Sequence, residues 1–343
     1  MDRVRMRDVA VHAGVSVRTV SNVVNGYAHV STAMRDRVQR SLDELDYKMD
    51  YLARGLKSGR TGFIAMVVPY LDEPYFALLS QAVVRAAAGR GLGVLVDMTG
   101  SDPAAELKTI QDGMASVADG VLVCHPGQLP EARLPSPGFP LVIVGGPRPG
   151  PELDYVGTDD AAAARAAVVH LARSGRRRIA MIGASPGNSG RRQHDGYQQA
   201  LAEADLEPAG TLARPDQEPG AAAGMAEMDR YLDGTAPAPD AVFAASDVVA
   251  IGVLRSLAEH GLRVPGDVAV IGVGGIAEAE YITPSLSSIA FDLDAMAGRA
   301  LDLLEEQTGP GRESRTPRHE STPFRLVARE STGPPASMQL AEA

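Results

Sequence analysis

The fold of the first sixty residues is decided by residues 6–24, which read MRDVAVHAGVSVRTVSNVV. Apolar side chains recur at helical spacing from Met6 to Ala13, and Gly14 then permits a tight turn. A second helix follows over 17–24, and Ser16 is placed to cap its first turn. Two short helices joined by a tight turn are typical of a DNA-reading helix-turn-helix unit.

The outward face of this second helix suits the major groove of DNA. Val20, Val23 and Val24 form an inward stripe, which leaves the other side chains outside. Arg18 can donate to guanine, Asn22 can pair with adenine, and a valine methyl can touch thymine. The predicted outward set is Val17, Arg18, Ser21 and Asn22.

A third helix completes this small unit. We expect it to begin after a capping Ser31 and to run to about Leu45, with an apolar face that includes Val38. Its Arg35 and Arg37 are available for phosphate. A small helical bundle with ordinary solvated charges is the alternative interpretation of the same pattern.

The charge of the chain is divided unevenly. The net charge is -10, yet residues 1–60 carry 11 Lys and Arg against 7 Asp and Glu, whereas the remainder carries 22 against 36. A basic head on an acidic body can approach phosphate while the body is kept off it.

After residue 62 the pattern changes to apolar runs of strand length that alternate with helical stretches, which predicts an α/β body. Nearly continuous apolar runs are typical of parallel strands covered on both faces. The predicted strands are 63–68, 93–97, 120–124, 141–144, 178–182, 241–244 and 268–271. The predicted helices are 78–88, 104–116, 161–174, 196–203 and 248–260.

Several other classes of protein are disfavoured. The glycine-rich loops at 183–187 and 272–275 lack both dinucleotide-binding and phosphate-loop spacing, so we expect no enzyme, no catalytic residue and no cofactor. The seven histidines and the single Cys124 form no metal-ligand pattern, so no metal is expected, and Cys124 is predicted to be buried. The first residues lack a signal peptide and no run is long enough to span a membrane, which predicts a cytoplasmic, nucleoid-associated protein.

The N-terminal residues closely resemble the headpiece of the LacI/GalR (lactose-repressor) family. The resemblance is carried by the segments 8–10, 13–16, 19–21, 30–31, 37–38 and 44–47. It implies that Val17, Arg18 and Asn22 read bases. It implies phosphate contacts for Ser16, Thr19, Ser21, Asn25 and Tyr47.

The same resemblance makes residues 51–56 a hinge helix. Leu56 and Arg54 then correspond to the minor-groove contacts, with Leu56 wedged at the centre of a palindromic operator. The family's usual Pro-Asn before the hinge is Met49-Asp50 here, which keeps a capping side chain but loses the stiffness of proline.

The body also resembles the family, in segments that include 73–76, 245–247, 261–268, 284–289 and 324–332. This implies an all-α helix-turn-helix headpiece joined to an α/β periplasmic-binding-protein-like domain of two Rossmann-like subdomains, which are connected by three crossings. The expected boundaries are 1–48 for the headpiece, 49–60 for the hinge and linker, 61–332 for the effector and dimerisation domain, and 333–343 for a tail. Within the body, the first subdomain takes about 61–158 plus 290–322, and the second about 159–289 plus 323–332.

The effector site is transferred from the family residue by residue. Tyr75, Phe76 and Asp247 stand where the family lines its pocket, and Asp247 keeps an acceptor for a ligand hydroxyl or amine. Three positions depart from the pattern. The family's arginine before Gly196 is Gln193, with Arg192 one step earlier; its ligand-gripping aspartate is Gly274; and the acidic residue after the strand at 141–144 is Gly145. These changes predict a roomier pocket for an atypical ligand, against the alternative of a sugar bound by other residues.

We therefore expect a transcriptional regulator, most naturally a repressor, that binds double-stranded operator DNA as a homodimer under the control of a small-molecule effector. The tail is too short and proline-rich for a tetramerising leucine-heptad helix. Two alternatives stay open: a regulator switched by a protein partner, and a small-molecule binding protein without DNA function.

Overall fold

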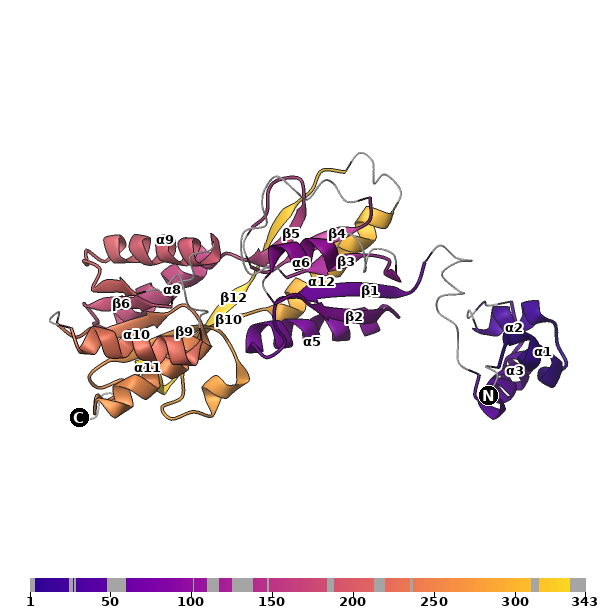
Figure 1. Cartoon of the computed structure of the whole chain (residues 1–343), viewed down its shortest axis with the longest axis horizontal. Coiled ribbons are helices and arrows are strands. Elements are labelled where there is room, and N and C mark those ends of the chain that lie inside the picture. The colour runs from indigo at the N-terminus through magenta and orange to yellow at the C-terminus, as the bar shows by residue number, and fades with distance from the viewer. Residues whose placement is uncertain are drawn as a thin grey trace, which may run out of the picture. The chain divides into compact units, whose positions relative to one another are not determined.

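The chain forms two compact units, Met1–Thr61 and Gly62–Ala343, in the computed structural model shown in Figure 1. The structure describes residues 4–24, 27, 29–47, 60–100, 102–109, 117–124, 138–146, 148–183, 188–212, 220–234, 237–309 and 315–333. None of the helices in these ranges is both long enough and apolar enough to cross a membrane.

The first unit is a three-helix bundle made of α1 (Met6–Ala13), α2 (Val17–Val24) and α3 (Thr32–Glu44). Its core takes one face from each helix, and the central side chains are Val9, Val20 and Val38, each fully buried. Burial of such side chains stabilises a small domain by about 2 kcal/mol each. The predicted helices and their inward faces are confirmed.

The first sheet of the second unit contains six parallel strands. Their spatial order is β11-β5-β4-β3-β1-β2, so β2 and β11 are the edges. The strands are β1 (Phe63–Val68), β2 (Gly93–Met98), β3 (Val121–Val123), β4 (Leu141–Val144), β5 (Asp154–Thr158) and β11 (His319–Thr322). Helices α5 (Pro74–Ala88) and α12 (Leu293–Thr308) bury their apolar stripes together on one face of this sheet. A short helix, α6 (Pro103–Lys108), follows β2.

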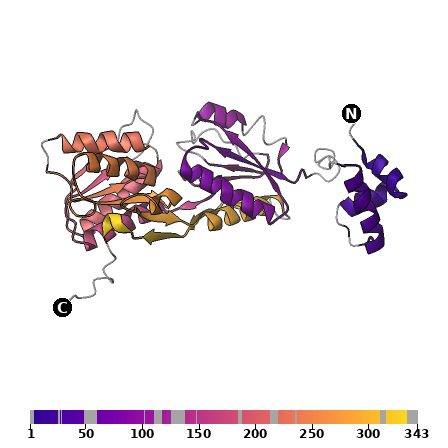
Figure 2. The same cartoon turned by 90° about the horizontal axis from the view of Figure 1, so that it is seen from below.

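The second sheet has the order β12-β10-β9-β8-β6-β7, and only β12 runs antiparallel to its neighbour. Helices α8 (Asp160–Arg173) and α9 (Asn188–Glu203) pack on one face, and α10 (Ala221–Leu232) and α11 (Asp247–Glu259) on the other. The strands are β6 (Ile179–Ile182), β7 (Gly210–Leu212), β8 (Ala241–Ala244), β9 (Ala269–Gly274), β10 (Ser287–Phe291) and β12 (Phe324–Val327). Figure 2 shows the helices on the two faces of this sheet.

Glycine lets the paired helices come close. A Cβ on Gly196 of α9 would overlap with the backbone of Ala161 in α8, and a Cβ on Gly252 of α11 would overlap with the backbone of Ala221 in α10. Any larger residue at these positions would push the helices apart.

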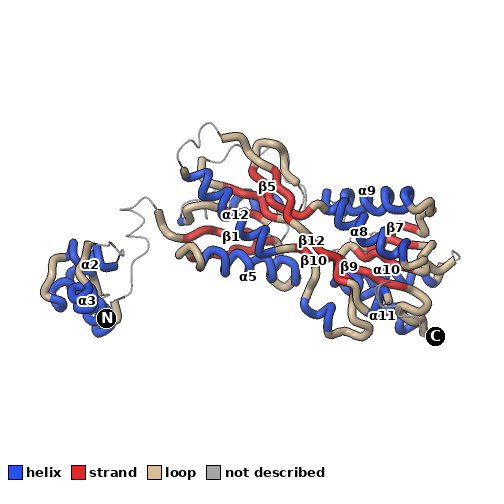
Figure 3. The backbone as a smooth tube through the Cα atoms, turned by 180° about the vertical axis from the view of Figure 1, so that it is seen from behind, coloured by secondary structure: helices blue, strands red, loops and turns tan. Residues whose placement is uncertain are grey.

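The chain passes between the two sheets three times. It leaves the first sheet after β5, returns after β10 to form α12 and β11, and crosses again to β12. The crossing strands β10 and β12 lie side by side, as Figure 3 shows from behind. Two short 3₁₀ helices, η2 (Ala277–Glu280) and η4 (Glu330–Thr332), belong to the second sheet's subdomain, since their residues pack on β9 and β10.

All seven predicted strands are present, with ends shifted by at most three residues. The predicted helix 104–116 is described only as far as α6, because residues 110–116 lie outside the described ranges. The strands β5, β7, β10, β11 and β12 and the helices α10 and α12 were not predicted.

Candidate DNA-reading surface and effector site

Local contacts fix both the turn between α1 and α2 and the start of α1. Gly14 has a φ of 64°, in the left-handed region that glycine adopts without strain. The Ser16 hydroxyl accepts a hydrogen bond from the Thr19 amide at 3.0 Å, so Ser16 caps α2 as predicted. At the start of α1, the Asp8 carboxylate accepts from the Arg5 amide at 2.8 Å and satisfies one donor there.

The predicted base-reading side chains lie on the open side of α2. Val17 is 45% exposed although it is apolar, and Arg18 is exposed as well. Ser21 and Asn22 are half-buried, whereas Val20 and Val23 on the opposite side are in the core. Val17 and Arg18 are therefore open to solvent at positions that would meet base edges, while Ser21 and Asn22 are partly covered.

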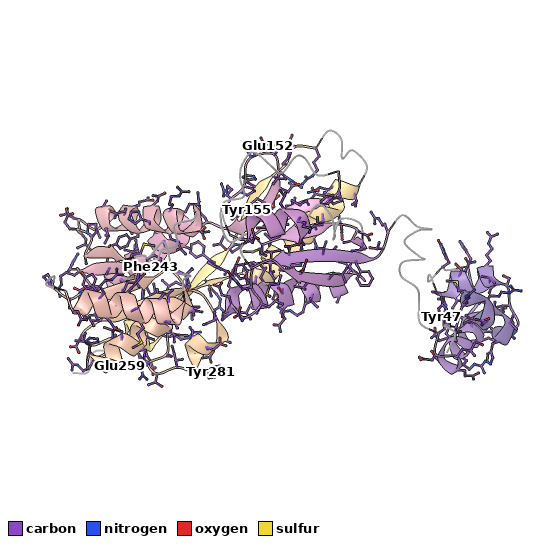
Figure 4. The ribbon with its side chains drawn as sticks, in the orientation of Figure 1. Tyr47, Glu152, Tyr155, Phe243, Glu259 and Tyr281 are labelled. Carbon is purple, nitrogen blue, oxygen red and sulfur yellow. The ribbon has the colours of Figure 1, made fainter. Side chains whose placement is uncertain are left out.

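The predicted phosphate contacts have different surroundings. The hydroxyls of Ser16 and Thr19 bond each other at 2.9 Å. Tyr47 is half-buried and packs against the bundle core (Figure 4). Asn25, Asp50 and the two minor-groove residues Arg54 and Leu56 lie outside the described residues.

One expectation about α3 is corrected. Ser31 stands at its N-cap, but its side chain makes no capping hydrogen bond, and the first turn is closed by backbone bonds to the Ser31 carbonyl. Arg35 donates from Nη2 to the Tyr27 carbonyl at 3.0 Å, and its availability for phosphate stays a prediction. Arg37 is exposed.

The predicted effector residues of the first subdomain form an aromatic group at the start of α5. Phe76 is buried in the core beneath the sheet. The Tyr75 ring packs edge-on against Phe76 and against Phe291 at the end of β10, with centroid distances of 5.2 and 5.9 Å. Burial raises the pKa of Tyr75 well above its ordinary value, so the hydroxyl stays neutral.

The Tyr75 hydroxyl also occupies the space beside Gly145. It points to the Met296 sulfur at 3.9 Å and fills the space that a Cβ on Gly145 would take. The predicted gain of room at this position is therefore wrong, because the chain's own tyrosine occupies the space.

Asp247 begins α11 and is fully buried. Its Oδ2 accepts from the amides of Gly275 and Ile276 at 2.6 and 2.9 Å, so the carboxylate holds the loop after β9. Burial raises its pKa, while the nearby Ser288 hydroxyl and the two amides act in the opposite direction. Oδ1 lies against the backbone of Gly272 without a hydrogen-bond partner among the described residues.

The other three predicted effector residues are close to Asp247 or to the first crossing. Arg192 forms an ion pair with Asp159 at 2.8 Å, and Gln193 Nε2 donates to the Ala245 carbonyl at 3.1 Å. Gly274 has a φ of 130°, and a Cβ there would stand 3.5 Å from Asp247 Oδ2. The polar side chains of this set thus all have internal partners.

Models of known protein families match segments in both units of the chain. Residues 5–50 match the model of the bacterial regulatory proteins of the lacI family, and residues 168–332 match a periplasmic binding protein-like domain. The ribose operon repressor of Halalkalibacterium halodurans is 30% identical over 95% of this chain and 96% of its own length. The chain belongs to the LacI family.

Two solved structures of the LacI family support the fold. A complex of the transcriptional regulator CelR with cellobiose is 31% identical, covers 96% of this chain and 100% of its own, and superposes with a TM-score of 0.69. The lac repressor dimer bound to operator and the anti-inducer ONPF is 24% identical, covers 97% and 100%, and has a TM-score of 0.83. The predicted fold class, a helix-turn-helix headpiece with a periplasmic-binding-protein-like body, is confirmed.

The sequence did not predict the cluster of polar side chains around Asp160 and Tyr155, where the chain first crosses from one sheet to the other. Asp160 accepts from the Ser189 hydroxyl at 2.8 Å, and burial raises its pKa to about 6 although Ser189 and Arg192 act against this. Tyr155 of β5 donates to the Gly146 carbonyl at 3.1 Å and carries the Arg148 guanidinium over its ring at 5.6 Å. Consecutive aspartates at a strand-to-helix junction were the available signal, since they suit a helix N-terminus.

The described residues show nothing that adds redox or metal chemistry to the LacI-family body. Within them, no three His, Cys, Asp or Glu side chains are grouped to hold a metal ion. Cys124 is buried at the end of β3, and burial raises its pKa, which suppresses the reactive thiolate.

Proposed function

We propose that this LacI-family chain represses transcription by binding a palindromic operator as a homodimer, and that a ligand in its body controls this binding. The observation that carries the proposal is the rigidly capped α2, which keeps Val17 and Arg18 exposed on one side of the bundle. Arginine donors and an apolar methyl on one face of a helix match base edges in the major groove. One such helix covers too few base pairs alone, which favours two copies on a two-fold site.

The headpiece and the body support a regulator rather than an enzyme. A binding protein without DNA function would leave the helix-turn-helix unit unexplained. We place the protein in the cytoplasm, at the nucleoid.

The ligand is proposed to bind between the subdomains, near Tyr75, Asp160 and Asp247, at the carboxyl ends of the strands. These ends are where open α/β sheets bind ligands. The relative CelR has been crystallised with cellobiose, which makes a sugar the first ligand class to test. A sugar hydroxyl would have to share or replace an internal partner at Arg192 and Gln193. At Asp247, Oδ2 is engaged by the loop after β9, whereas Oδ1 has no hydrogen-bond partner among the described residues.

The same internal bonding favours a second candidate, a body switched by a protein partner. Melting curves of the full chain with a panel of mono- and disaccharides test control by a sugar. A sugar that raises the melting temperature and changes operator affinity supports the ligand-controlled form. A flat response across the panel argues against a sugar and leaves a non-sugar ligand or a protein partner as the switch.

The homodimer has a candidate surface on the first subdomain. β2 is an edge strand, and its Val96 and Met98 are exposed, as is Val84 of α5, the helix that packs on this sheet. Apolar groups gathered on an exposed edge are typical of a protein interface.

Sedimentation tests this surface. Met98→Asp is expected to convert a dimer to a monomer and to weaken operator binding, while Glu152→Lys, a charge change at another exposed site, leaves the dimer intact. A dimer that survives Met98→Asp together with Val96→Asp would place the interface elsewhere.

In-vitro selection of bound DNA from a random duplex pool, at a stated salt concentration, tests the DNA-binding mode. We expect a palindrome with a central CG step, the form that fits two headpieces and a central wedge. Recovery of non-palindromic sequences would contradict binding as a symmetric dimer. Recovery of only non-specific DNA would show that the headpiece does not read bases unaided.

A further inference from the structure

Tyr27 is an exposed aromatic residue just beyond the recognition helix. The residue is 57% exposed, and it is not part of the apolar core around Val9, Val20 and Val38. A side chain outside the core adds little apolar burial to the stability of the bundle. Core packing of the bundle therefore does not call for a tyrosine at this position.

Both polar groups of the Tyr27 backbone, the amide and the carbonyl, make hydrogen bonds. The Tyr27 amide donates to the Asn22 carbonyl at 3.0 Å, and the Tyr27 carbonyl accepts from Arg35 Nη2 at 3.0 Å. A bond from an amide to a carbonyl five residues earlier typically closes the C-terminus of a helix. Tyr27 is thus fixed both to α2, where Asn22 lies, and to α3.

In this type of helix ending, an apolar residue at the position of Tyr27 commonly packs back onto the helix. Here more than half of the side chain stays in solvent. The two hydrogen bonds fix the Tyr27 backbone, so a partner that binds the side chain has less backbone entropy to remove.

We propose that Tyr27 is an additional DNA contact, which binds the sugar-phosphate backbone beside the bases read by α2. Its ring would pack on a deoxyribose and its hydroxyl would donate to a phosphate oxygen, a donor class common in protein–DNA interfaces. The contact carries no charge, so it adds affinity without releasing a further counterion. The proposal rests on α2 being the base-reading helix.

Arg35 acts through this residue. Its guanidinium, which the sequence made available for phosphate, donates from Nη2 to the Tyr27 carbonyl. Arg35 is therefore a positioning residue for the Tyr27 contact.

The test uses the full-length protein and the operator recovered by selection. Tyr27→Ala is expected to lower affinity about 5-fold for every operator variant, which is about 1 kcal/mol, without changing their ranking. Tyr27→Phe is expected to lose part of this affinity. The slope of log affinity against log salt stays unchanged in both variants, because no charge is removed. Val11→Ala, which trims a still more exposed apolar side chain on α1, is the control and leaves affinity unchanged.

Phosphate ethylation interference gives a direct readout. Ethylation of one phosphate in each half-site should impair binding of the wild type and lose its effect in Tyr27→Phe. If both Tyr27 variants bind like the wild type, or if no phosphate loses its effect, the contact is refuted. Arg18→Ala measured on the same operators keeps this result separate: altered ranking in Arg18→Ala with unchanged Tyr27 variants would refute the Tyr27 contact and leave the reading by α2 in place.

Discussion

The Tyr75 hydroxyl occupies the position that a side chain on Gly145 would need. Gly145 follows β4 with a φ of 65°, and Tyr75 comes from the first turn of α5, seventy residues earlier in the chain. The two positions are therefore coupled, because a side chain at position 145 would overlap with the Tyr75 hydroxyl. The carboxylate common in the family at this position is replaced by a neutral phenol that is aimed at Met296.

This relationship predicts a coupled effect on stability. Gly145→Ala should lower the free energy of unfolding by about 3 kcal/mol, from backbone strain at positive φ together with overlap with the hydroxyl. The same substitution in a Tyr75→Phe background should cost about 1 kcal/mol less, because the overlapping atom is gone. A double-mutant cycle by urea denaturation measures this coupling.

Gly91 provides the control for strain alone. Its φ is 70°, and a Cβ there would meet nothing within 4 Å. Gly91→Ala should cost the same in both backgrounds. Additive effects of Gly145→Ala and Tyr75→Phe would contradict the packing of Tyr75 against Gly145.

The sequence predicted the central elements of the fold because their burial pattern is strong. β1, β4 and β8 were located to the residue, since each is a continuous apolar run bounded by turn residues. β11 and β12 escaped because they are edge strands of four residues with mixed polarity, such as HEST over 319–322. Their place depends on crossings between subdomains, which local periodicity does not record.

The contacts of the candidate effector residues could not be predicted from the sequence. The family resemblance placed Tyr75, Asp247 and Arg192 in a ligand pocket, and this stays a prediction. The structure shows them bonded to Met296, to the loop after β9 and to Asp159. Such partners lie far away in the sequence, so spacing alone does not reveal whether a polar group is already satisfied.

Asp160 predicts an unusual dependence of stability on pH. Its folded-state pKa of about 6 lies above the ordinary value, so the folded state binds this proton more tightly than the unfolded state. The resulting stabilisation is present at low pH and is lost as pH rises through about 6, by about 3 kcal/mol. In Asp160→Asn this loss should disappear, and the variant should gain on the wild type between pH 4 and 7 in thermal melts.

The neighbouring Asp159 serves as a comparison of opposite sign. Burial acts to raise its pKa, but the Ala162 amide and Arg192 prevail, and the pKa is lowered. Its contribution is therefore present above the ordinary pKa and lost as pH falls, so Asp159→Asn should be most harmful near neutral pH. Identical pH profiles for the two variants would argue against the assigned surroundings of Asp160.

His170 predicts acid sensitivity in the second subdomain. Its Nε2 lies 2.9 Å from Thr332 Oγ1, which in turn lies 2.8 Å from Ser287 Oγ, and burial lowers its pKa. The folded state resists protonation of His170, so its stabilisation is full above the ordinary pKa and falls as pH drops below about 6.5. His170→Gln should flatten this part of the profile; a variant that loses stability from pH 7 to 5 as steeply as the wild type would rule His170 out.

Two of the exposed arginines of the headpiece, Arg18 and Arg37, predict different changes in DNA binding. Arg18 lies on the base-reading side of α2, so Arg18→Ala should cost about 1 to 3 kcal/mol at one base pair of each half-site and relax the preference there. Arg37 lies on α3 and is exposed, so Arg37→Ala should weaken binding to all sequences alike and reduce the salt slope by about 1 for each headpiece. Fluorescence anisotropy on the selected operator and its single-base variants, at three salt concentrations, measures both effects. If Arg18→Ala leaves the ranking of operators unchanged, the base-reading face of α2 has been assigned wrongly, because a bidentate donor to guanine cannot be removed without changing the preference for that base.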